Sequence, residues 1–528
     1  MFEKVIYMSA RKLLPRDVAS FDVLIKGNYL YVDKTALLHD LMTQGRFYFL
    51  SRPRRFGKSL LVSTLKHIFL GDQELFGDCW IGQKRRYDWA MHPVIHLDFS
   101  ALDLMDVGAL EKSLSDEINY IAQLYAIELQ SDLLLISRFV ELVRALYKRG
   151  PVVILVDEYD APLVKHVTNP ILVEQMRLFL SNFYSTIKSL DGYLRFLFLT
   201  GVSKFSKTSV FSGMNNLIDI SLEPQAAALC GYTQEEVVGN FSPYIEEVAS
   251  AQGVAVSSVL EQMQQWYNGY RFSRALTRVY NPFSVLYFLA TKEYGNYWFA
   301  SATPTFLVKL IRKNFASFTR VSDVVVDEAL LSAFDIDTLP LITLLFQTGY
   351  LTIKNYDSQL RLYTLDYPNE EVRLAFNNGL MVDSLEGVLG SDVTVISQKL
   401  RYALESDDVA AFCSSMQVLF AHIPAELHIQ KEAYYHSLFQ MIVSLVGLSA
   451  TSEVATSVGF IDVVIQTAHA VFVFEFKLNK NPYVALEQIK SRRYYEKYID
   501  LGKKIFLVGL AFSFQGKRLA YAVQSLHD

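Results

Sequence analysis

Residues 47–65 read FYFLSRPRRFGKSLLVSTL, and the order of residue types in this stretch decides the fold of the first part of the chain. A short apolar run precedes a basic turn, and Gly57, Lys58 and Ser59 then open a run with helical spacing of apolar residues. Backbone N–H groups at a helix N-terminus bind phosphate, a lysine there reaches the β- and γ-phosphates, and a serine hydroxyl can ligate Mg²⁺. The predicted nucleotide-binding residues of this loop are Arg55, Phe56, Gly57, Lys58, Ser59 and Leu60.

Two later apolar runs end in polar residues that suit the same chemistry. PVVILVDEYDAPL places Asp157 and Glu158 at the end of a buried strand, where Asp157 is predicted to hold Mg²⁺ and Glu158 to orient the attacking water. LRFLFLTGVSKF ends near Thr200, which is predicted to sense the γ-phosphate. The alternative for each residue is a polar group that only satisfies a strand end.

The pattern around these motifs predicts an α/β fold. Runs such as VVILV lack the alternation of a half-exposed strand, so we expect a mostly parallel sheet with helices on both faces. We predict a P-loop domain over residues 1–225, a mainly helical middle region over residues 226–400, and a C-terminal α/β domain over residues 401–528. Thr233, with Glu236 three residues later, predicts the start of the first middle helix.

Composition limits the classes of protein to which the chain can belong. Hydrophobic residues make up 51% and charged residues 20%, which favours a chain that folds throughout. The formal net charge of -5 means that contact with nucleic acid would need a local basic patch. Three cysteines without CxxC spacing and the lack of a long apolar segment favour a cytoplasmic protein that does not enter a membrane.

Near the C-terminus, VFVFEFK predicts a strand with Glu475 and Lys477 on one face. A hairpin between IDVVI and this strand would bring Asp462 beside Glu475. Two adjacent carboxylates favour a bridging divalent cation, and Lys477 could then position the hydrolytic water, as a nuclease requires. The alternative is an ion-pair network on the surface of a sheet.

The first half of the chain resembles the bacterial AAA-ATPase-like family. The matching stretches are NYLYVDKTALLHDL, FLSRPRRFGKSLLVSTL, ILVDEYDAPL, FLTGVSKFSKTSVFSGMNNLIDIS and GYTQEEV. The resemblance implies binding and hydrolysis of ATP with Mg²⁺. It also implies that Arg52, which replaces the first glycine of the usual phosphate-binding loop, is normal for the family.

The last hundred residues resemble the PD-(D/E)XK nuclease superfamily, in the branch fused to such ATPases. The matching stretches are EAYYHSLF, SEVATSVGFIDVVI, FVFEFKLN and ALEQIKSRRYYEKY. The resemblance implies a restriction-endonuclease-like fold that acts on nucleic acid, with Asp462 and Glu475 as metal ligands and Lys477 as a catalytic residue. Glu432 and Glu453 are both candidates for a further metal ligand or a helper acid. Phe460 departs from the family, which commonly has arginine there.

Our leading interpretation is an ATP-driven or ATP-gated nuclease that uses Mg²⁺ at both sites. The first alternative is a nucleotide-dependent switch whose C-terminal domain only binds nucleic acid or a partner protein. The second is a transport or mechanical ATPase in which the C-terminal carboxylates are structural. DNA and RNA are both compatible targets. A homo-oligomer that shares Arg177 or Arg195 across an interface is compatible as well.

Overall fold

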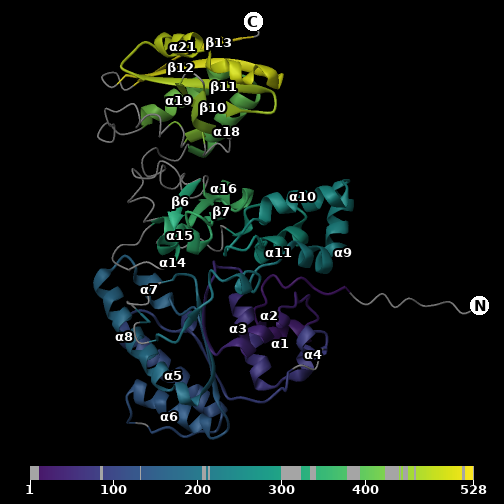
Figure 1. Ribbon diagram of the computed structural model, residues 1–528, viewed down its shortest axis with the longest axis vertical. Coiled ribbons are helices and arrows are strands. Elements are labelled where there is room, and N and C mark those ends of the chain that lie inside the picture. Colours follow the sequence, from purple (N-terminus) through teal and green to yellow (C-terminus); the bar gives the residue numbers. More distant parts are fainter. Residues whose placement is uncertain are drawn as a thin grey trace, which may run out of the picture. The chain divides into compact units, whose positions relative to one another are not determined.

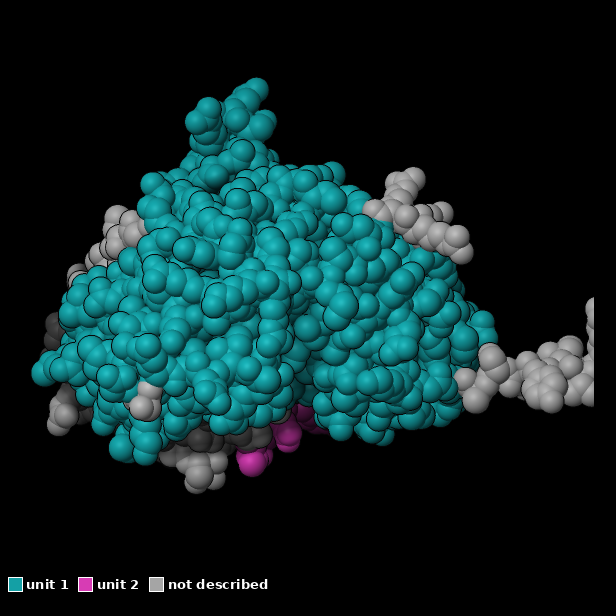
Figure 2. All heavy atoms as spheres, turned by 90° about the horizontal axis from the view of Figure 1, so that it is seen from below, with its two compact units in different colours: residues 1–310, 320–372 teal, residues 311–319, 373–528 magenta. Residues whose placement is uncertain are grey.

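The computed structural model describes residues 11–83, 87–130, 132–204, 210–211, 214–298, 323–332, 341–376, 393–422, 439, 442–443, 450–456, 459–513 and 518–526. The chain forms two compact units, which Figure 2 shows in different colours. Unit 1 comprises residues 1–310 and 320–372, and unit 2 comprises residues 311–319 and 373–528. Each unit contains a five-stranded sheet, and unit 1 has a further sheet of three strands.

The larger sheet of unit 1 is parallel and has the strand order β2-β3-β4-β1-β5. Its strands are β1 (Phe47–Ser51), β2 (Val94–Asp98), β3 (Val152–Asp157), β4 (Leu194–Gly201) and β5 (Ile218–Asp219). Every residue of β1 and β3 is buried. The continuous apolar runs of the sequence therefore correspond to strands covered on both faces, as predicted.

Two groups of helices cover the opposite faces of this sheet (Figure 1). The first group is α1 (Phe21–Lys26), α2 (Thr35–Gln44), α3 (Lys58–Leu70) and α4 (Trp80–Gln83). The second group is α5 (Val107–Leu124), α6 (Leu135–Tyr147), α7 (Ala161–His166) and α8 (Pro170–Ser189). The helix α3 directly follows the basic turn after β1, so the phosphate-binding loop has the predicted strand, turn and helix order.

The middle of the chain begins with the helices α9 (Gln234–Gln252), α10 (Val256–Tyr267) and α11 (Pro282–Thr291). The predicted capping box is confirmed, because Thr233 and Glu236 exchange hydrogen bonds between side chain and backbone at the start of α9. The three helices share a hydrophobic core with Leu30 and Val32 of the N-terminal part. They are therefore part of the same compact unit as the parallel sheet.

The middle region is mainly helical, as predicted, but it also contains an antiparallel sheet that was not predicted. Its strands have the order β6-β8-β7. They are β6 (Val324–Asp327), β7 (Thr352–Asp357) and β8 (Leu362–Asp366). The accompanying helices are α14 (Glu328–Ser332), α15 (Leu341–Thr348) and α16 (Glu370–Ala375).

Unit 2 is built on a mixed sheet of order β13-β12-β11-β10-β9, in which only the β11 to β12 pairing is parallel. The strands are β9 (Ala450–Thr456), β10 (Gly459–Gln466), β11 (Ala470–Leu478), β12 (Lys504–Ser513) and β13 (Arg518–Ser525). The helices are α18 (Val393–Glu405), α19 (Val409–His422), α21 (Pro482–Ser491) and the 3₁₀ helix η8 (Tyr494–Leu501). The predicted α/β module is therefore present, with β9 and β13 as additional edge strands.

Candidate functional site

The loop between β1 and α3 contains two residues with left-handed backbone conformations. Arg55 has a φ of 68° and Gly57 a φ of 89°. Gly57 is the N-cap of α3, and Lys58 is the first residue of the helix. Phe56, between the two left-handed residues, turns into the core, where its ring lies 4.7 Å from that of Tyr270. The loop thus leaves the start of α3 accessible, where the first N–H groups have no partner within the helix and can bind an anion.

Arg52, which occupies the position of the missing first glycine, has a structural role. Its guanidinium is 1% exposed and donates hydrogen bonds to the carbonyls of Ser51, Ser221 and Ala226 at 2.8 to 2.9 Å. Burial lowers the pKa of this guanidinium to about 10. The side chain therefore ties the loop to the segment after β5 and does not occupy the space of a bound phosphate.

Lys58 and the acids at the end of β3 converge, as predicted. Lys58 Nζ lies 3.5 Å from Glu158 Oε1 and donates a hydrogen bond of 3.2 Å to the carbonyl of Pro53. Glu158 has a φ of 50°, a backbone conformation that is uncommon for residues other than glycine. The pKa of Asp157 is raised to about 6 because burial disfavours its charge, although a hydrogen bond from Ser59 lowers it.

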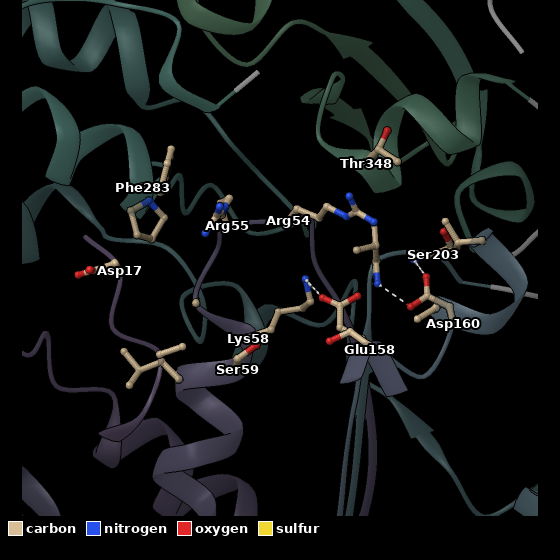
Figure 3. A pocket seen from close by; sticks show the side chains of 18 of the residues that line it. Asp17, Arg54, Arg55, Lys58, Ser59, Glu158, Asp160, Ser203, Phe283 and Thr348 are labelled. Atoms are coloured by element: carbon tan, nitrogen blue, oxygen red, sulfur yellow. Dashed lines mark hydrogen bonds and ion pairs between the residues drawn. The ribbon is translucent and has the colours of Figure 1, made fainter. Parts of the chain in front are cut away.

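These groups border a cavity of about 800 Å³ within unit 1. Figure 3 shows Lys58, Ser59 and Glu158 on one side of it and Thr348 on another, with Arg54 and Arg55 between them. The volume is in the range of small-molecule sites, which is about 300–1,000 Å³. The cavity is therefore large enough for a nucleotide.

Asp160 is a residue of this cavity that the sequence analysis missed. Its carboxylate accepts hydrogen bonds from the backbone N–H groups of Val202 and Ser203, at 3.2 and 2.6 Å. It thereby ties the end of β3 to the end of β4. Burial and the charge of Glu158 raise its pKa. The repeated acid in VDEYD was a usable signal, because Asp160 follows Asp157 by three residues.

Three predicted nucleotide-binding residues lie behind the cavity wall, because Phe56, Asp157 and Thr200 are buried and are not among its lining residues. The hydroxyl of Thr200 donates a hydrogen bond of 2.9 Å to the carbonyl of Leu50 and so joins β4 to β1. Ser203 lines the cavity at the end of the same strand. The role of Thr200 as a γ-phosphate sensor stays a prediction.

The middle region supplies part of the cavity wall, which the sequence analysis did not foresee. Phe283 of α11 and Thr348 of α15 line the cavity. The guanidinium of Arg55 lies 4.7 Å from the centre of the Phe283 ring, a cation–π distance. The indole of Trp298 donates a hydrogen bond of 3.1 Å to the carbonyl of Arg54. Two residues of the middle region, Phe283 and Trp298, thus hold the phosphate-binding loop.

The second candidate site lies on the hairpin of β10 and β11. The two strands pair antiparallel, and their register places Val463 opposite Phe474, so that Asp462 and Glu475 are the next pair along. Oδ2 of Asp462 accepts a hydrogen bond of 2.7 Å from the N–H of Phe476. The hairpin and its register are therefore confirmed.

Strand alternation also places the charged residues as predicted. Glu475 and Lys477 share the face of β11 that α21 covers, because Gln488 of α21 donates a hydrogen bond to Glu475. Phe474 and Phe476 lie on the other face, where both rings contact Phe439. Glu475 Oε1 accepts a hydrogen bond of 3.1 Å from Lys477 Nζ, and the two groups form an ion pair.

The buried carboxylate of Glu475 has an unusual environment. It is 2% exposed, and its Oε2 atom has no hydrogen-bond partner among the described residues. Burial and the charge of Asp462 raise its pKa to about 7. The opposite residue on β12 is Gly509, where a Cβ would collide with the backbone of Pro482 and Leu486. The glycine lets α21 approach closely enough for Gln488 to reach Glu475.

The structure does not describe the side chains of the other residues singled out for the predicted nuclease site. Glu432 lies outside the described residues, as do the side chains of Glu453 and Phe460. Across the described ranges, no cluster of three or more His, Cys, Asp or Glu side chains has the arrangement of a metal site. None of the helices in the described part of the chain combines the length and the apolar character that crossing a bilayer requires.

Two parts of the chain match models of known protein families. Residues 15–211 match the model of a family of predicted AAA-ATPases. Residues 430–521 match a model of the PD-(D/E)XK nuclease superfamily. A protein of Azotobacter chroococcum mcd 1, described as an uncharacterized protein in the vnfD 5′ region, is 36% identical over 534 residues, which cover 98% of this chain and all of that protein.

Proposed function

Since the chain belongs to the AAA-ATPase-like family and carries a C-terminal domain of the PD-(D/E)XK nuclease superfamily, we propose that it hydrolyses ATP and cleaves nucleic acid. Hydrolysis in unit 1 would control cleavage in unit 2. The proposed domains are a P-loop domain over residues 1–225, a mainly helical middle region over residues 226–400 and a nuclease-like domain over residues 401–528. Both DNA and RNA are candidate targets, and a homo-oligomer is a candidate assembly.

The observation that carries the ATPase proposal is the convergence of Lys58 and Glu158 on one cavity at the N-terminus of α3. Lys58 and the N–H groups of residues 55–60 would bind the phosphates. When nucleotide is bound, Lys58 would exchange its ion pair with Glu158 for the phosphates and keep its hydrogen bond to the carbonyl of Pro53. Glu158 would then orient the attacking water and accept its proton.

Mg²⁺ fits the donor groups at both sites. Ser59 and Asp157 would hold it in unit 1, and Asp462 and Glu475 would hold it in unit 2. Oε2 of Glu475, which has no hydrogen-bond partner within the described ranges, and the buried carboxylate of Asp157 are oxygen donors of the kind that Mg²⁺ prefers. Mg²⁺ usually takes one or two carboxylates and keeps several waters, so two protein ligands are sufficient. The ion would stabilise negative charge that develops on the phosphate oxygens.

In unit 2 the chain's own residues have separable tasks. Asp462 and Glu475 face each other across the hairpin and would position the scissile phosphate through their shared cation. Lys477 lies on the same face as Glu475 and would position the attacking water or stabilise charge on the phosphate. A switch that only binds nucleic acid is the alternative, and the replacement of the family's arginine by Phe460 favours it.

Two variants test the proposal in paired assays of ATP hydrolysis and of nucleic-acid cleavage with Mg²⁺. Lys58→Ala should lower ATP turnover at least about 100-fold, because the lysine neutralises charge on the transferring phosphoryl group. Lys477→Ala should abolish cleavage and leave ATP turnover largely intact. Lys66→Ala, two turns further along α3, and Lys504→Ala, on the strand beside β11, are matched controls that should retain both activities.

Each outcome points to a different part of the proposal. Unchanged ATP turnover in Lys58→Ala would refute the assignment of the phosphate-binding loop. Wild-type protein that hydrolyses ATP but cleaves neither DNA nor RNA, single-stranded or double-stranded, would remove the nuclease and leave the nucleotide-dependent switch. Cleavage that persists in Lys477→Ala would show that the assigned site on β10 and β11 does not perform it.

A further inference from the structure

The three arginines of the phosphate-binding loop have different environments. Arg52 is buried, and its two terminal nitrogens donate hydrogen bonds to backbone carbonyls. Arg55 is exposed, and its guanidinium lies over the ring of Phe283. Arg54 is half-buried and lines the cavity. No carboxylate in the described part of the chain forms an ion pair with it. Arg54 and Arg55 both line the cavity, and Arg54 is the one whose guanidinium neither lies over a ring nor pairs with a carboxylate among the described residues.

The backbone that carries Arg54 is held in place by three separate elements. Lys58 Nζ donates a hydrogen bond to the carbonyl of Pro53, and the indole of Trp298 donates one to the carbonyl of Arg54. Gly349, just after α15, has a φ of 92°, and a Cβ on it would lie 2.8 Å from the Pro53 ring. The loop is thus clamped between α3 and the middle region, which fixes the point from which the Arg54 side chain extends.

The Arg54 side chain extends from this backbone into the cavity. Figure 3 shows its side chain on the cavity side of the loop, in the part of the cavity that also contains Lys58, Glu158 and Asp160. A nucleotide held by the N-terminus of α3 would place its last phosphate toward Glu158, because that carboxylate pairs with Lys58. The side chain of Arg54, which lines the same part of the cavity, would then be within reach of that phosphate.

We propose that Arg54 is a catalytic residue that binds the γ-phosphoryl group of the nucleotide within the same subunit. The proposal rests on the ATPase function proposed above. In the reaction a water oxygen forms a bond to the γ-phosphorus while the bond from that phosphorus to the bridging oxygen breaks, and the electron pair leaves with ADP. The proton lost by the water passes to Glu158. Arg54 donates hydrogen bonds to the γ-phosphoryl oxygens, where negative charge is spread in the transition state.

Arginine suits this position better than a second lysine. Its planar guanidinium can donate two parallel hydrogen bonds to a phosphoryl group, whereas Lys58 already supplies a compact point charge. Arginines that stabilise phosphoryl transfer raise turnover by about 10³ to 10⁵ in related chemistry, whether they come from the same chain or from a partner. A loop residue in this position would make an arginine from a neighbouring subunit unnecessary.

The test compares Arg54→Ala and Arg54→Lys with the wild-type protein. Turnover of ATP should fall at least about 100-fold in Arg54→Ala and be only partly restored in Arg54→Lys. Affinity for ADP should stay within about threefold of wild type, because ADP lacks the γ-phosphate. The stable complex with ADP and aluminium fluoride, which mimics the transferring phosphoryl group, should form in the wild type and be lost in Arg54→Ala.

Arg46→Ala is the matched control, because Arg46 lies at the other end of β1 and pairs with Asp191 on the surface. It should leave turnover and the fluoride complex unchanged. Turnover in Arg54→Ala within threefold of wild type, or an equal loss of ADP binding, would overturn this inference alone. Wild-type protein that binds neither ATP nor ADP would overturn the ATPase function and this inference together.

Discussion

Glu371 is a carboxyl group in α16 with no exposed surface, and replacing it with glutamine should change how the stability of unit 1 depends on pH. Its Oε1 atom accepts a hydrogen bond of 2.8 Å from the N–H of Trp298, and its Oε2 atom accepts one of 2.7 Å from the hydroxyl of Ser284. The phenols of Tyr267 and Tyr270 lie close enough for a charge on Glu371 to raise their pKa values. Burial raises its pKa from 4.5 to about 7, although the hydrogen bonds oppose this shift.

The size of the effect follows from proton linkage. Between pH 4.5 and pH 7 the unfolded chain has lost a proton that the folded chain keeps on Glu371. The free energy of unfolding therefore falls as the pH rises through this window, by about 3 kcal/mol in all. Below the window both states are protonated, and above it both are ionised. Glutamine does not ionise, so Glu371→Gln avoids this loss. The difference in free energy of unfolding between Glu371→Gln and wild type should therefore rise by the same amount as the pH increases through the window.

Tryptophan fluorescence in urea measures this difference, because all four tryptophans precede residue 310 and report on unit 1. They are Trp80, Trp89, Trp266 and Trp298. Curves at about pH 4 and about pH 8 should show the gain for Glu371→Gln at the higher pH only. Glu370→Gln removes the same charge one residue away and should show no such dependence. A difference from wild type that is equal at both pH values would refute the buried, protonated carboxyl.

Two further variants test a residue that lines the cavity and a residue that supports the phosphate-binding loop. Glu158→Gln should keep nucleotide affinity and slow ATP hydrolysis about 100-fold, as measured by equilibrium binding and phosphate release, whereas an equal loss of binding would reassign Glu158 to metal coordination. Arg52→Met leaves the carbonyls of Ser51, Ser221 and Ala226 without their donor, so the free energy of unfolding should fall by about 3 kcal/mol. An unchanged urea midpoint for Arg52→Met would contradict its structural role.

The elements that the sequence predicted well depend on local patterns. The strands β1 to β4 follow from continuous apolar runs, and the start of α9 follows from the spacing of Thr233 and Glu236. Asp462 pairs with Glu475 because β10 and β11 form a short hairpin, and the register of a hairpin depends only on its two strands and the turn between them. In each case the residues that determine the element lie within about fifteen positions of one another.

The parts that the sequence did not predict depend on contacts between distant residues. The hydrogen bond from Trp298 to Arg54 joins residues 244 positions apart, and the one from Lys204 to Gln347 joins residues 143 positions apart. Hydrophobic periodicity reports which face of an element is buried but not which distant element covers it. Thr348 could therefore not be assigned to the cavity, although its own helix is readable as an apolar run.

The strained residues of the cavity explain why the middle region matters to the phosphate site. Arg55 and Glu158 are both left-handed, and such conformations cost about 1–3 kcal/mol each unless the surroundings hold them. Phe56, next to Arg55, is 1% exposed and packs against the rings of Tyr270 and Phe272. Burying a phenylalanine contributes about 1.5–3 kcal/mol, which offsets the cost of the left-handed loop. A nucleotide that moves this loop must therefore also move the segment after α10, which gives hydrolysis a physical route into the middle region.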